Sequence, residues 1–590
     1  MIAENILSSS SSSSSLSDMP PHKKAKTEYI YPSTLRTVSV HSITSKQHPL
    51  NVKPAGNSLL ASDPDLLEKR KKLLGKLSIL PNELILLIIS YIPDAKTLLS
   101  ISHTSRILYA LISDEENWKQ IYVRNIAEYD NRPWLGSWRN TVLGIPWSDN
   151  ANLQLESNLL CCDEIYRPVQ CSQIDYKKLF AKILVEEETY HRDSLLNQLG
   201  KLPKGRILRI AESELDVDEF NTIYHNTPFI LTNSDTTRRW PQWTFELLFQ
   251  RFPHVKFRQE AVSWDLEKYS QYLDHNCDEN PLYLFDCNSD AMKQLKKEYE
   301  PPKIFQDDLF KVFQQTNLGF NCRPDHAWLI MGSARSGSTF HKDPNSTSAW
   351  NVAIQGRKLW IMLPPNVQPP GVSTDDEESE VTSPVGIAEW VISGFYNDSV
   401  RLDEVQIGVT FPGECMYVPA GWWHSVINID DSIAITQNFV PQSKLPHVLN
   451  FFKNKPKQIS GFRIKQVKQC LDLLVKKSTE DEGLLNYVEQ LNNKLNNKLG
   501  LNGETVMMID DEEDCGEITD LPQLPIFEIF KQLLVNDGKE EMVNDALQTV
   551  QRWEEKAYMN ETGRSKAWEK LTEVNETSAF SFGFSESDSE

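Results

Sequence analysis

The chain has 590 residues, of which 40% are hydrophobic and 10% aromatic, a composition typical of a globular protein with roughly three to four domains. Its formal net charge of −21 argues against direct binding to nucleic acid or to an anionic membrane, whereas a basic protein substrate is easily accommodated. The 9 cysteines show no paired CxxC spacing, and we find neither an apolar run of transmembrane length nor a signal peptide. These features indicate neither a disulfide framework nor a zinc site, and they fit a reducing compartment.

The amino-terminal residues 1–72 are rich in serine and lack apolar periodicity, so we expect them to be disordered. Basic clusters occupy residues 20–26 and 69–72. The first cluster is similar to a nuclear import signal, although such clusters are often only solvated charge. The sequence therefore predicts a nuclear location, with the cytoplasm as the alternative.

A helical unit is predicted over residues 73–125. Pro81 suits the first turn of a helix, and apolar residues then recur at helical spacing, namely Leu84, Leu87, Ile88 and Tyr91. Further helices follow at 98–102 and 106–112. This succession resembles an F-box, and the resemblance implies docking on the Skp-type adaptor of a cullin ubiquitin ligase through residues 77–118. An ordinary three-helix subdomain that packs on the rest of the chain is the alternative.

A tryptophan-rich connector, residues 126–205, is predicted to pack the first helical unit onto the segment that follows. It contains Trp134, Trp138 and Trp147, and a helical stretch over 176–199. From about residue 207 the pattern is mixed. We expect strands at 228–232, 255–257, 280–286 and 328–332. A short helix is expected at 244–250.

Three residues far apart in the chain form a candidate metal site: His341, Asp343 and His424. Two imidazoles and one carboxylate suit a non-haem Fe(II) centre that keeps open coordination positions. In a strand, residues two apart project to the same face, so His341 and Asp343 can reach one ion while Lys342 points away. Open positions on the iron would be free for a co-substrate and dioxygen.

The segment from residue 280 to 440 resembles the JmjC family of Fe(II)- and 2-oxoglutarate-dependent oxygenases. Within it, the likeness is to the lysyl hydroxylase and arginine demethylase group that includes the former phosphatidylserine receptor. The matching motifs are residues 307–310, 335–337, 341–344, 347–351, 356–358, 412–414, 418–424 and 433–439. The resemblance implies a double-stranded β-helix (a jelly-roll or cupin barrel). The predicted fold class is therefore α+β, with F-box helices before the barrel and further helices after it.

The resemblance also implies roles for individual residues. It makes His341, Asp343 and His424 the iron ligands, and it pairs Lys358 with the distal carboxylate of 2-oxoglutarate. A lysine that faces a barrel interior is costly unless it is paired, which supports that role for Lys358. An exposed position on a surface strand is the alternative.

Further positions match the family's co-substrate and substrate sites. Asn351, Thr436 and Tyr283 correspond to residues that hydrogen-bond the co-substrate, although such residues, when buried, often satisfy only the local backbone. Trp328 and Phe285 correspond to positions near the substrate pocket, with a core role as the alternative.

The predicted function is hydroxylation or demethylation of a protein side chain, lysine or arginine, with Fe(II), 2-oxoglutarate and dioxygen. The alternative is a substrate adaptor of an SCF-type ubiquitin ligase that uses the barrel as a binding module. The resembled group places an acidic residue near the substrate pocket, shortly before a tryptophan segment. Here residues 384–388 carry no carboxylate and Glu389 follows one step later, so the choice of lysine as target stays open.

An acidic insertion at 372–383 is expected to be a mobile loop, either simply solvated or an acidic rim for a basic substrate. Beyond the barrel, helical spacing recurs at 466–476 and 484–499, and a dimer is one of the states left open. The predicted domains are 1–72 (disordered), 73–125 (F-box), 126–205 (connector), 206–445 (JmjC domain), 446–505 (helices), 506–520 (acidic linker), 521–575 (helical unit) and 576–590 (disordered acidic tail).

Overall fold

The computed structural model describes residues 64–145, 174–192, 203–276, 278, 280–315, 319–375, 378, 381–382, 386–392, 394–477, 485 and 525–572. The chain divides into two compact units. Unit 1 comprises residues 1–306, 325–343 and 348–438, and unit 2 comprises residues 307–324, 344–347 and 439–590. No single helix of the described ranges is long and apolar enough to span a membrane, although the bent pair Arg70–Ile79 and Leu84–Ser90 meets that test together.

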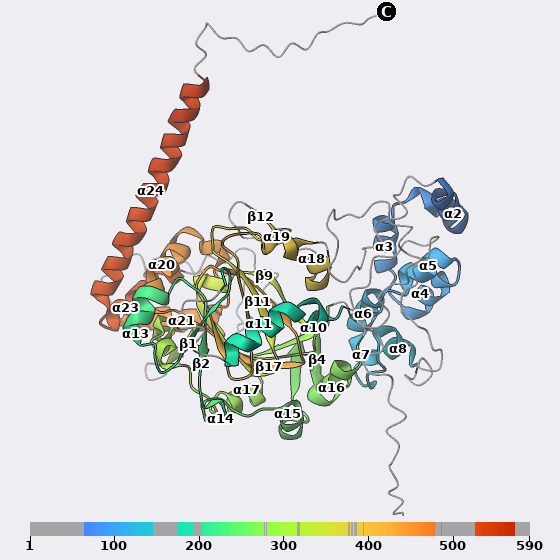
Figure 1. The fold of residues 1–590 in the computed structure, drawn as a ribbon, viewed down its shortest axis with the longest axis horizontal. Coiled ribbons are helices and arrows are strands. Elements are labelled where there is room, and N and C mark those ends of the chain that lie inside the picture. Colours follow the sequence, from blue (N-terminus) through green and yellow to red (C-terminus); the bar gives the residue numbers. More distant parts are fainter. Residues whose placement is uncertain are drawn as a thin grey trace, which may run out of the picture. The chain divides into compact units, whose positions relative to one another are not determined.

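Unit 1 begins with short helices, drawn in blue in Figure 1. They are α2 (Pro64–Leu74), η2 (Gly75–Ile79), α3 (Asn82–Ser90), α4 (Ala95–Ser102), α5 (Arg106–Ile112), α6 (Glu115–Arg124), α7 (Ile126–Tyr129) and α8 (Trp138–Leu143). Side chains cap several of them, since Asp94, Ser105 and Asp114 each accept a hydrogen bond from a backbone N–H of the first turn. The helices predicted at 98–102 and 106–112 are confirmed, and Pro81 is the N-cap of α3 rather than a member of its first turn.

The predicted disorder of residues 1–72 is wrong for its last part, because helix α2 starts at Pro64. The contacts of Arg70 explain why this part of the chain is ordered. Its side chain is only 8% exposed, and its guanidinium donates to the backbone oxygens of Ser78 and Leu80. One basic residue of the 69–72 cluster therefore binds the segment that precedes α3 instead of lying free in solvent. The cluster at 20–26 lies outside the described residues, as do Trp147, 193–199, most of 484–499, the linker at 506–520 and the tail at 576–590.

Two sheets form the barrel of unit 1 in the described part of the chain. The larger has nine strands in the order β1-β2-β15-β10-β17-β8-β5-β3-β4, and the smaller has four in the order β14-β11-β16-β9. The strands of the larger sheet are β1 (Leu208–Ala211), β2 (Phe229–Thr232), β3 (Lys256–Gln259), β4 (Val262–Asp265), β5 (Tyr283–Asp286), β8 (Ala327–Gly332), β10 (Ser348–Gln355), β15 (Cys415–Val418) and β17 (Ser432–Phe439). Those of the smaller sheet are β9 (Gly337–His341), β11 (Lys358–Leu363), β14 (Gln406–Thr410) and β16 (Trp423–Asn428).

Alternation along β11 shows which side chains face the barrel interior. Trp360 and Met362 pack against Ile230 and Met416 of the larger sheet, so their face of β11 is the inner one. Leu359, Ile361 and Leu363 instead pack outward, in a cluster that includes Phe180, Leu184 and Trp390. Figure 1 shows α11 crossing in front of these strands. The smaller sheet is therefore buried on both faces, which is why β11 reads as a nearly continuous apolar run.

Other helices of unit 1 connect and cover the strands. They are α10 (Tyr176–Leu179), α11 (Ala181–Arg192), α13 (Val217–Glu219), η4 (Phe220–Tyr224), α14 (Thr236–Arg239), α15 (Phe245–Arg251), α16 (Leu266–Asp274), α17 (Asp290–Leu295), η5 (Lys303–Phe305), α18 (Ile387–Ile392) and α19 (Phe395–Ser399). The predicted strands at 228–232, 255–257, 280–286 and 328–332 correspond to β2, β3, β5 and β8, and the predicted helix at 244–250 corresponds to α15.

The acidic insertion contains a short antiparallel hairpin, β12 (Ser373–Thr374) with β13 (Val381–Thr382). The insertion, which was predicted as a mobile loop, thus contains two short strands at these residues. Lys342, which lies between two predicted iron ligands, supplies a further anchor. Its ammonium donates to Glu378 of the insertion at 2.7 Å and to the backbone oxygen of Pro365 at 3.2 Å.

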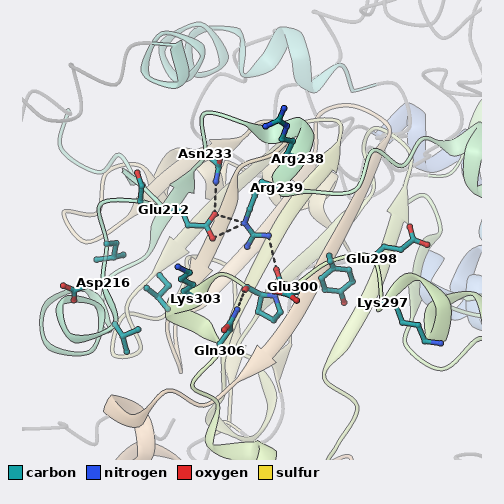
Figure 2. Close-up of a pocket in the computed structure, with 16 residues that line it drawn as sticks. Glu212, Asp216, Asn233, Arg238, Arg239, Lys297, Glu298, Glu300, Lys303 and Gln306 are labelled. Carbon is teal, nitrogen blue, oxygen red and sulfur yellow. Dashed lines mark hydrogen bonds and ion pairs between the residues drawn. The ribbon is translucent and has the colours of Figure 1, made fainter.

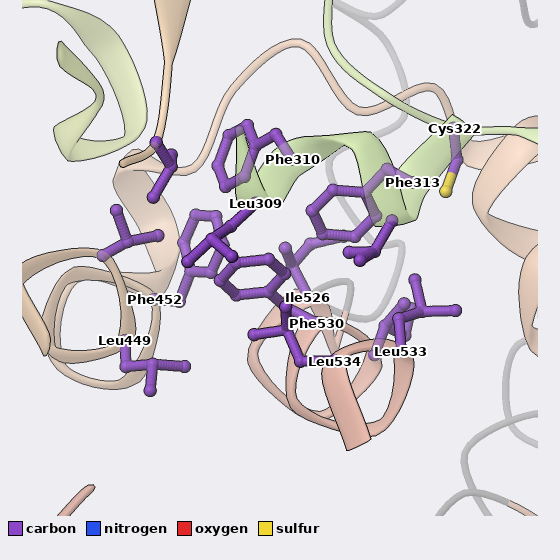
Figure 3. Packing of buried hydrophobic residues seen from close by; sticks show 14 of the residues in the cluster. Leu309, Phe310, Phe313, Cys322, Leu449, Phe452, Ile526, Phe530, Leu533 and Leu534 are labelled. Carbon is purple, nitrogen blue, oxygen red and sulfur yellow. The ribbon is translucent and has the colours of Figure 1, made fainter. Parts of the chain in front are cut away.

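Unit 2 is mainly helical. Its elements are η6 (Leu309–Phe313), β6 (Gln314–Gln315), β7 (Phe320–Asn321), η8 (Pro344–Ser346), η9 (Gln442–Lys444), α20 (Leu445–Asn454), η10 (Pro456–Gln458), α21 (Ile464–Lys477), α23 (Ile526–Asn536) and α24 (Glu540–Thr572). The helix predicted at 466–476 corresponds to α21. Figure 3 shows its apolar core, where Phe310 and Phe313 of η6 pack against Phe530 of α23. Residues 307–324, expected within the JmjC domain, thus contribute to the core of the carboxy-terminal helices.

Candidate metal centre

The predicted metal ligands converge in unit 1. One ligand atom from each of His341, Asp343 and His424 lies within 4.8 Å of the other two. His341 ends β9 and His424 is the second residue of β16, and the two are register partners on neighbouring antiparallel strands. Asp343 follows two residues after the end of β9, so the strand geometry expected for both residues holds only for His341. The chain leaves the sheet there and still brings the carboxylate to the pair of imidazoles.

Backbone hydrogen bonds orient both imidazoles. His341 Nδ1 lies 2.8 Å from the carbonyl oxygen of Thr339, and His424 Nδ1 lies 3.1 Å from that of Trp422. Because a carbonyl oxygen only accepts, each Nδ1 carries a proton, so in the neutral form of either ring Nε2 is the nitrogen with the free lone pair. Burial, and then the neighbouring His341, holds the pKa of His424 well below its ordinary value, so this imidazole is neutral. Metal ions bind that form.

The carboxylate of Asp343 also fits a bound cation. Its Oδ2 is shielded from solvent and has no hydrogen-bond partner within the described ranges. Burial raises the pKa of Asp343, and the neighbouring His341 and a hydrogen bond with Asn438 partly oppose that shift. A divalent cation would stabilise the charged carboxylate and occupy its unused oxygen. The three side chains therefore fit a divalent iron ion.

Lys358 is a buried cation on the inner face of β11. It is the first residue of β11, on the same face as Trp360 and Met362, and only 1% of it is exposed. Its ammonium donates to Tyr283 Oη at 2.7 Å and to Asn428 Oδ1 at 2.9 Å. Both partners are neutral, and burial lowers the pKa of Lys358 to about 7. An ammonium with three donors and two neutral partners can take one anionic oxygen more. The alternative of an exposed Lys358 is wrong.

The predicted co-substrate residues behave differently from one another. Tyr283 contacts Lys358 directly. Asn351 is 6% exposed and its Oδ1 has no partner in the described part of the chain, so this amide is available to a ligand. Thr436 instead donates its hydroxyl hydrogen to the backbone oxygen of Trp350 at 2.9 Å. For Thr436 the structure shows the local backbone bond that the sequence left as an alternative.

The two aromatic residues placed near the substrate pocket do not lie in the buried core. Phe285 is 42% exposed, and Trp328 is half-buried against the small apolar cluster that contains Tyr283. The rings of Phe285 and Tyr283 pack edge to face with centroids 4.7 Å apart. Phe285 thus covers one side of the tyrosine that contacts Lys358.

Asn428 is a functional residue that sequence reasoning missed. It lies four positions after His424 on β16 and is the register partner of Lys358. Its amide nitrogen donates to Ser336 Oγ at 2.8 Å, which turns its oxygen toward the lysine. The sequence did carry a signal for Asn428. It lies four residues after His424, and residues i, i+2 and i+4 of a strand share a face, so both side chains were expected on the same face.

A cavity of about 590 Å³ opens beside His341. A larger cavity, of about 860 Å³, lies at a different place in unit 1 and is lined by none of the predicted site residues. Figure 2 shows charged groups of that larger cavity bonded to one another. Arg239 Nε donates to the Glu212 carboxylate at 2.8 and 3.0 Å, and Asn233 donates to the same carboxylate at 3.2 Å. The smaller cavity is therefore the candidate substrate site.

Comparison with known proteins agrees with this geometry. An F-box-like family model matches residues 77–124, and a cupin-like domain model matches residues 214–445. Arginine-specific demethylase JMJ22 of Arabidopsis thaliana is 33% identical over 431 residues, which cover 71% of this chain and 78% of that protein. Bifunctional arginine demethylase and lysyl-hydroxylase psr-1 of Caenorhabditis elegans is 33% identical over 254 residues, covering 40% of this chain and 62% of that protein. For 2-oxoglutarate and iron-dependent oxygenase JMJD4 of Mus musculus the identity is 27% over 210 residues, 34% of this chain and 46% of that protein.

Proposed function

Because this chain belongs to the JmjC family of Fe(II)- and 2-oxoglutarate-dependent oxygenases and carries an F-box-like segment, we propose that it hydroxylates or demethylates a lysine or arginine side chain of a protein. The observation that carries the proposal is the convergence of His341, Asp343 and His424 on one point of the barrel. The names of the plant and nematode relatives support a basic side chain as the target.

Each residue of the site has a role in this proposal. His341, Asp343 and His424 would hold Fe(II) through two Nε2 atoms and one carboxylate. Lys358 would pair with the distal carboxylate of 2-oxoglutarate, while Tyr283 and Asn428 hold its ammonium in place. When bound, iron, 2-oxoglutarate and dioxygen supply the oxidising power for attack on a C–H bond. The barrel shields Lys358 and His424 from water, since both are buried.

The carbon that is presented decides the product. Oxidation of a side-chain methylene gives a stable alcohol. Oxidation of an N-methyl group gives a hemiaminal, which releases formaldehyde and leaves a demethylated nitrogen. The metal site supports both outcomes.

The direct test is conversion of 2-oxoglutarate to succinate by the purified full-length chain with Fe(II). We expect turnover in the wild type, turnover at the protein-free background in His341→Ala, and unchanged turnover in Lys256→Met, an exposed control position. Mn(II) should raise the thermal unfolding temperature of the wild type and should leave that of His341→Ala unchanged. Turnover that survives His341→Ala would contradict the iron assignment. A wild type that binds its adaptor but never turns over would favour a binding module instead.

The F-box-like segment supports a second role in the same chain. On α3, Ile85 and Ile89 are buried, whereas Leu84, Leu87 and Ile88 are exposed by 45%, 49% and 51%, and Tyr91 at the C-cap by 75%. A row of exposed apolar side chains on one short helix is typical of a protein-binding surface and not of a subdomain that packs only on its own chain. We therefore propose that a Skp-type adaptor binds through residues 77–118. The oxygenase and adaptor-binding roles are compatible with each other.

A further inference from the structure

The cavity beside His341 has two formally charged side chains in its wall besides that histidine, Glu260 and Arg335. Arg335 already has partners, because its guanidinium donates to the backbone oxygen of Asp278 at 2.7 Å and to Asn276 Oδ1 at 2.9 Å. Glu260 differs. Its Oε1 accepts one long hydrogen bond, 3.3 Å, from the backbone N–H of Tyr283. Its side chain is 47% exposed, so the carboxylate keeps accepting capacity at the cavity wall.

The nearest cation to Glu260 does not use that capacity. Lys119, on helix α6, has its ammonium 3.9 Å from Glu260 Oε2, which is too far for a hydrogen bond. The same ammonium lies 6.0 Å from the centre of the Trp138 ring. Oε2 thus has an attractive charge in its neighbourhood and no hydrogen-bond donor among the described residues.

The backbone holds Glu260 in place at a cost. Glu260 is the first residue of the two-residue turn between β3 and β4, and its φ is +50°. A residue with a Cβ rarely adopts this left-handed conformation, which costs on the order of 1 kcal/mol or more and is often found at functional sites. The turn points to a role for the side chain, because glycine would fit the backbone better.

Glu260 is also connected to the co-substrate residues. The N–H that it accepts belongs to Tyr283, the residue whose hydroxyl receives the ammonium of Lys358. Strand β5 therefore carries the backbone contact to the cavity carboxylate and the side-chain contact to the lysine. A substrate group bound at Glu260 would be placed beside His341.

Another part of the cavity wall cannot supply the carboxylate. Gly386 lines the cavity within the stretch 384–388, where the resembled group suggested an acidic residue. A Cβ at this position would lie 2.1 Å from Asn280 Oδ1, and its φ of +152° disfavours side chains as well. Only glycine fits there. Glu389 follows on α18 but does not line the cavity.

We infer that Glu260 binds the cationic end of the substrate side chain, a guanidinium or an ammonium, and so makes the site selective for arginine or lysine. This inference rests on the proposed oxygenase function and adds the residue that selects the substrate. The substrate cation would donate to Oε2, which accepts no hydrogen bond from the described residues.

The test uses the full-length chain with Fe(II), 2-oxoglutarate and a Glu-C digest of cell proteins, whose peptides keep internal lysine and arginine. Mass spectrometry should find the gain of one oxygen, or the loss of a methyl group, on arginine or lysine. Glu260→Gln should raise the KM for a modified peptide by about 10- to 100-fold, the effect of losing one charged hydrogen-bond partner, and leave the Kd for 2-oxoglutarate unchanged. Glu267→Gln on α16 removes the same charge from an exposed position outside the cavity wall and should change neither constant.

A second variant separates selection from folding. Glu260→Gly relieves the left-handed turn, so it should unfold at the same temperature as the wild type or higher while it also loses the preference for basic peptides. With Mn(II) in place of iron, calorimetry should show a basic peptide losing affinity in both variants, and its glutamine-substituted counterpart losing none. An unchanged preference in Glu260→Gln, or turnover of 2-oxoglutarate with products only on uncharged residues, would overturn the inference and leave the oxygenase standing. A wild type without any turnover would overturn the proposed function instead.

Discussion

Lys358 shows how strongly the fold changes the chemistry of one residue. An exposed lysine has a pKa near 10.5, and burial among neutral partners lowers the pKa of Lys358 to about 7. The folded, ligand-free protein therefore releases this proton at a lower pH than the unfolded chain does. Because the unfolded chain binds more protons between pH 7 and 10.5, the contribution of Lys358 to the free energy of unfolding rises with pH over that window.

Binding of 2-oxoglutarate should depend on pH in the opposite direction. An anionic carboxylate favours the charged ammonium, so binding takes up a proton above pH 7, and affinity should fall by up to about tenfold per pH unit. Calorimetry of the Mn(II)-loaded protein between about pH 6.5 and 8.5, in buffers of different ionisation enthalpy, measures both effects. Lys358→Met should weaken binding roughly 30-fold or more and remove the slope, because it removes a buried charge partner. The control Lys256→Met should keep the slope, and a slope that persists in Lys358→Met would mean that another group titrates.

At the residue scale, residue type and spacing predicted which side chains would lie together. His341, Asp343 and His424 were identified as ligands from the set of donor atoms, and they lie together. Glu260 could not be found in this way. It belongs to a turn between two short strands, and only the pairing of β3 with β5 brings that turn to the cavity.

At the scale of elements, an aromatic joint connects the F-box-like helices to the larger sheet. Tyr122 of α6 and Trp138 of α8 pack with Trp264 of β4, with ring centroids 5.2 to 5.8 Å apart. Polar atoms within the joint are paired. Trp138 Nε1 donates to the buried carboxylate of Asp278 at 2.9 and 3.0 Å. The predicted packing of Trp134 and Trp138 between the helical unit and the barrel is confirmed.

Substitution of Tyr122 tests how much its buried hydroxyl contributes to stability. Its hydroxyl accepts from Trp264 Nε1 at 3.2 Å and from Lys268 Nζ at 2.6 Å. Tyr122→Phe leaves these donors without that acceptor in a buried place, so it should lower the free energy of unfolding by about 1–3 kcal/mol in chemical denaturation. Tyr91→Phe, at a tyrosine that is 75% exposed, should change it by less than about 0.5 kcal/mol. Equal effects of the two substitutions would show that the buried hydroxyl of Tyr122 adds no stability.

Helices of the first unit were predictable because their apolar spacing and capping residues are local signals. Helix α2 and the hairpin of the acidic insertion were not. Both lie in stretches whose composition is polar, and both make contacts with residues outside those stretches, of Arg70 with the backbone oxygens of Ser78 and Leu80 and of Lys342 with Glu378. Composition cannot report such contacts.

At the scale of the whole molecule, two functional surfaces come from different sets of elements. The exposed apolar row lies on α3, while the metal site is built from β9, β16 and the residues after β9. No residue belongs to both. Adaptor binding and oxygenase turnover should therefore be separable by mutation.

The separating variant is Ile88→Asp, at an isoleucine that is 51% exposed. A charge in the middle of an apolar interface should weaken co-purification with the Skp-type adaptor by roughly 30-fold or more, about 2 kcal/mol. Turnover of 2-oxoglutarate should stay at the wild-type rate. Ile126→Asp, the same substitution at an exposed isoleucine outside residues 77–118, should affect neither. Retained adaptor binding in Ile88→Asp would refute the F-box surface, and lost turnover would show that the two roles are coupled.

The sequence alone was enough to predict the class of this protein. The F-box-like succession and the motifs that resemble the JmjC family are read along the chain, and the donor atoms of the two histidines and the aspartate follow from residue type, which folding does not alter. The tertiary structure decided what depends on neighbours. It turned Lys358 inward between Tyr283 and Asn428, and it paired the Thr436 hydroxyl with the backbone oxygen of Trp350. It exposed the apolar face of α3. It also brought Glu260 to the cavity of His341. Burial, register and the pairing of distant strands set these outcomes, and none of them is written in the spacing of residues along one segment.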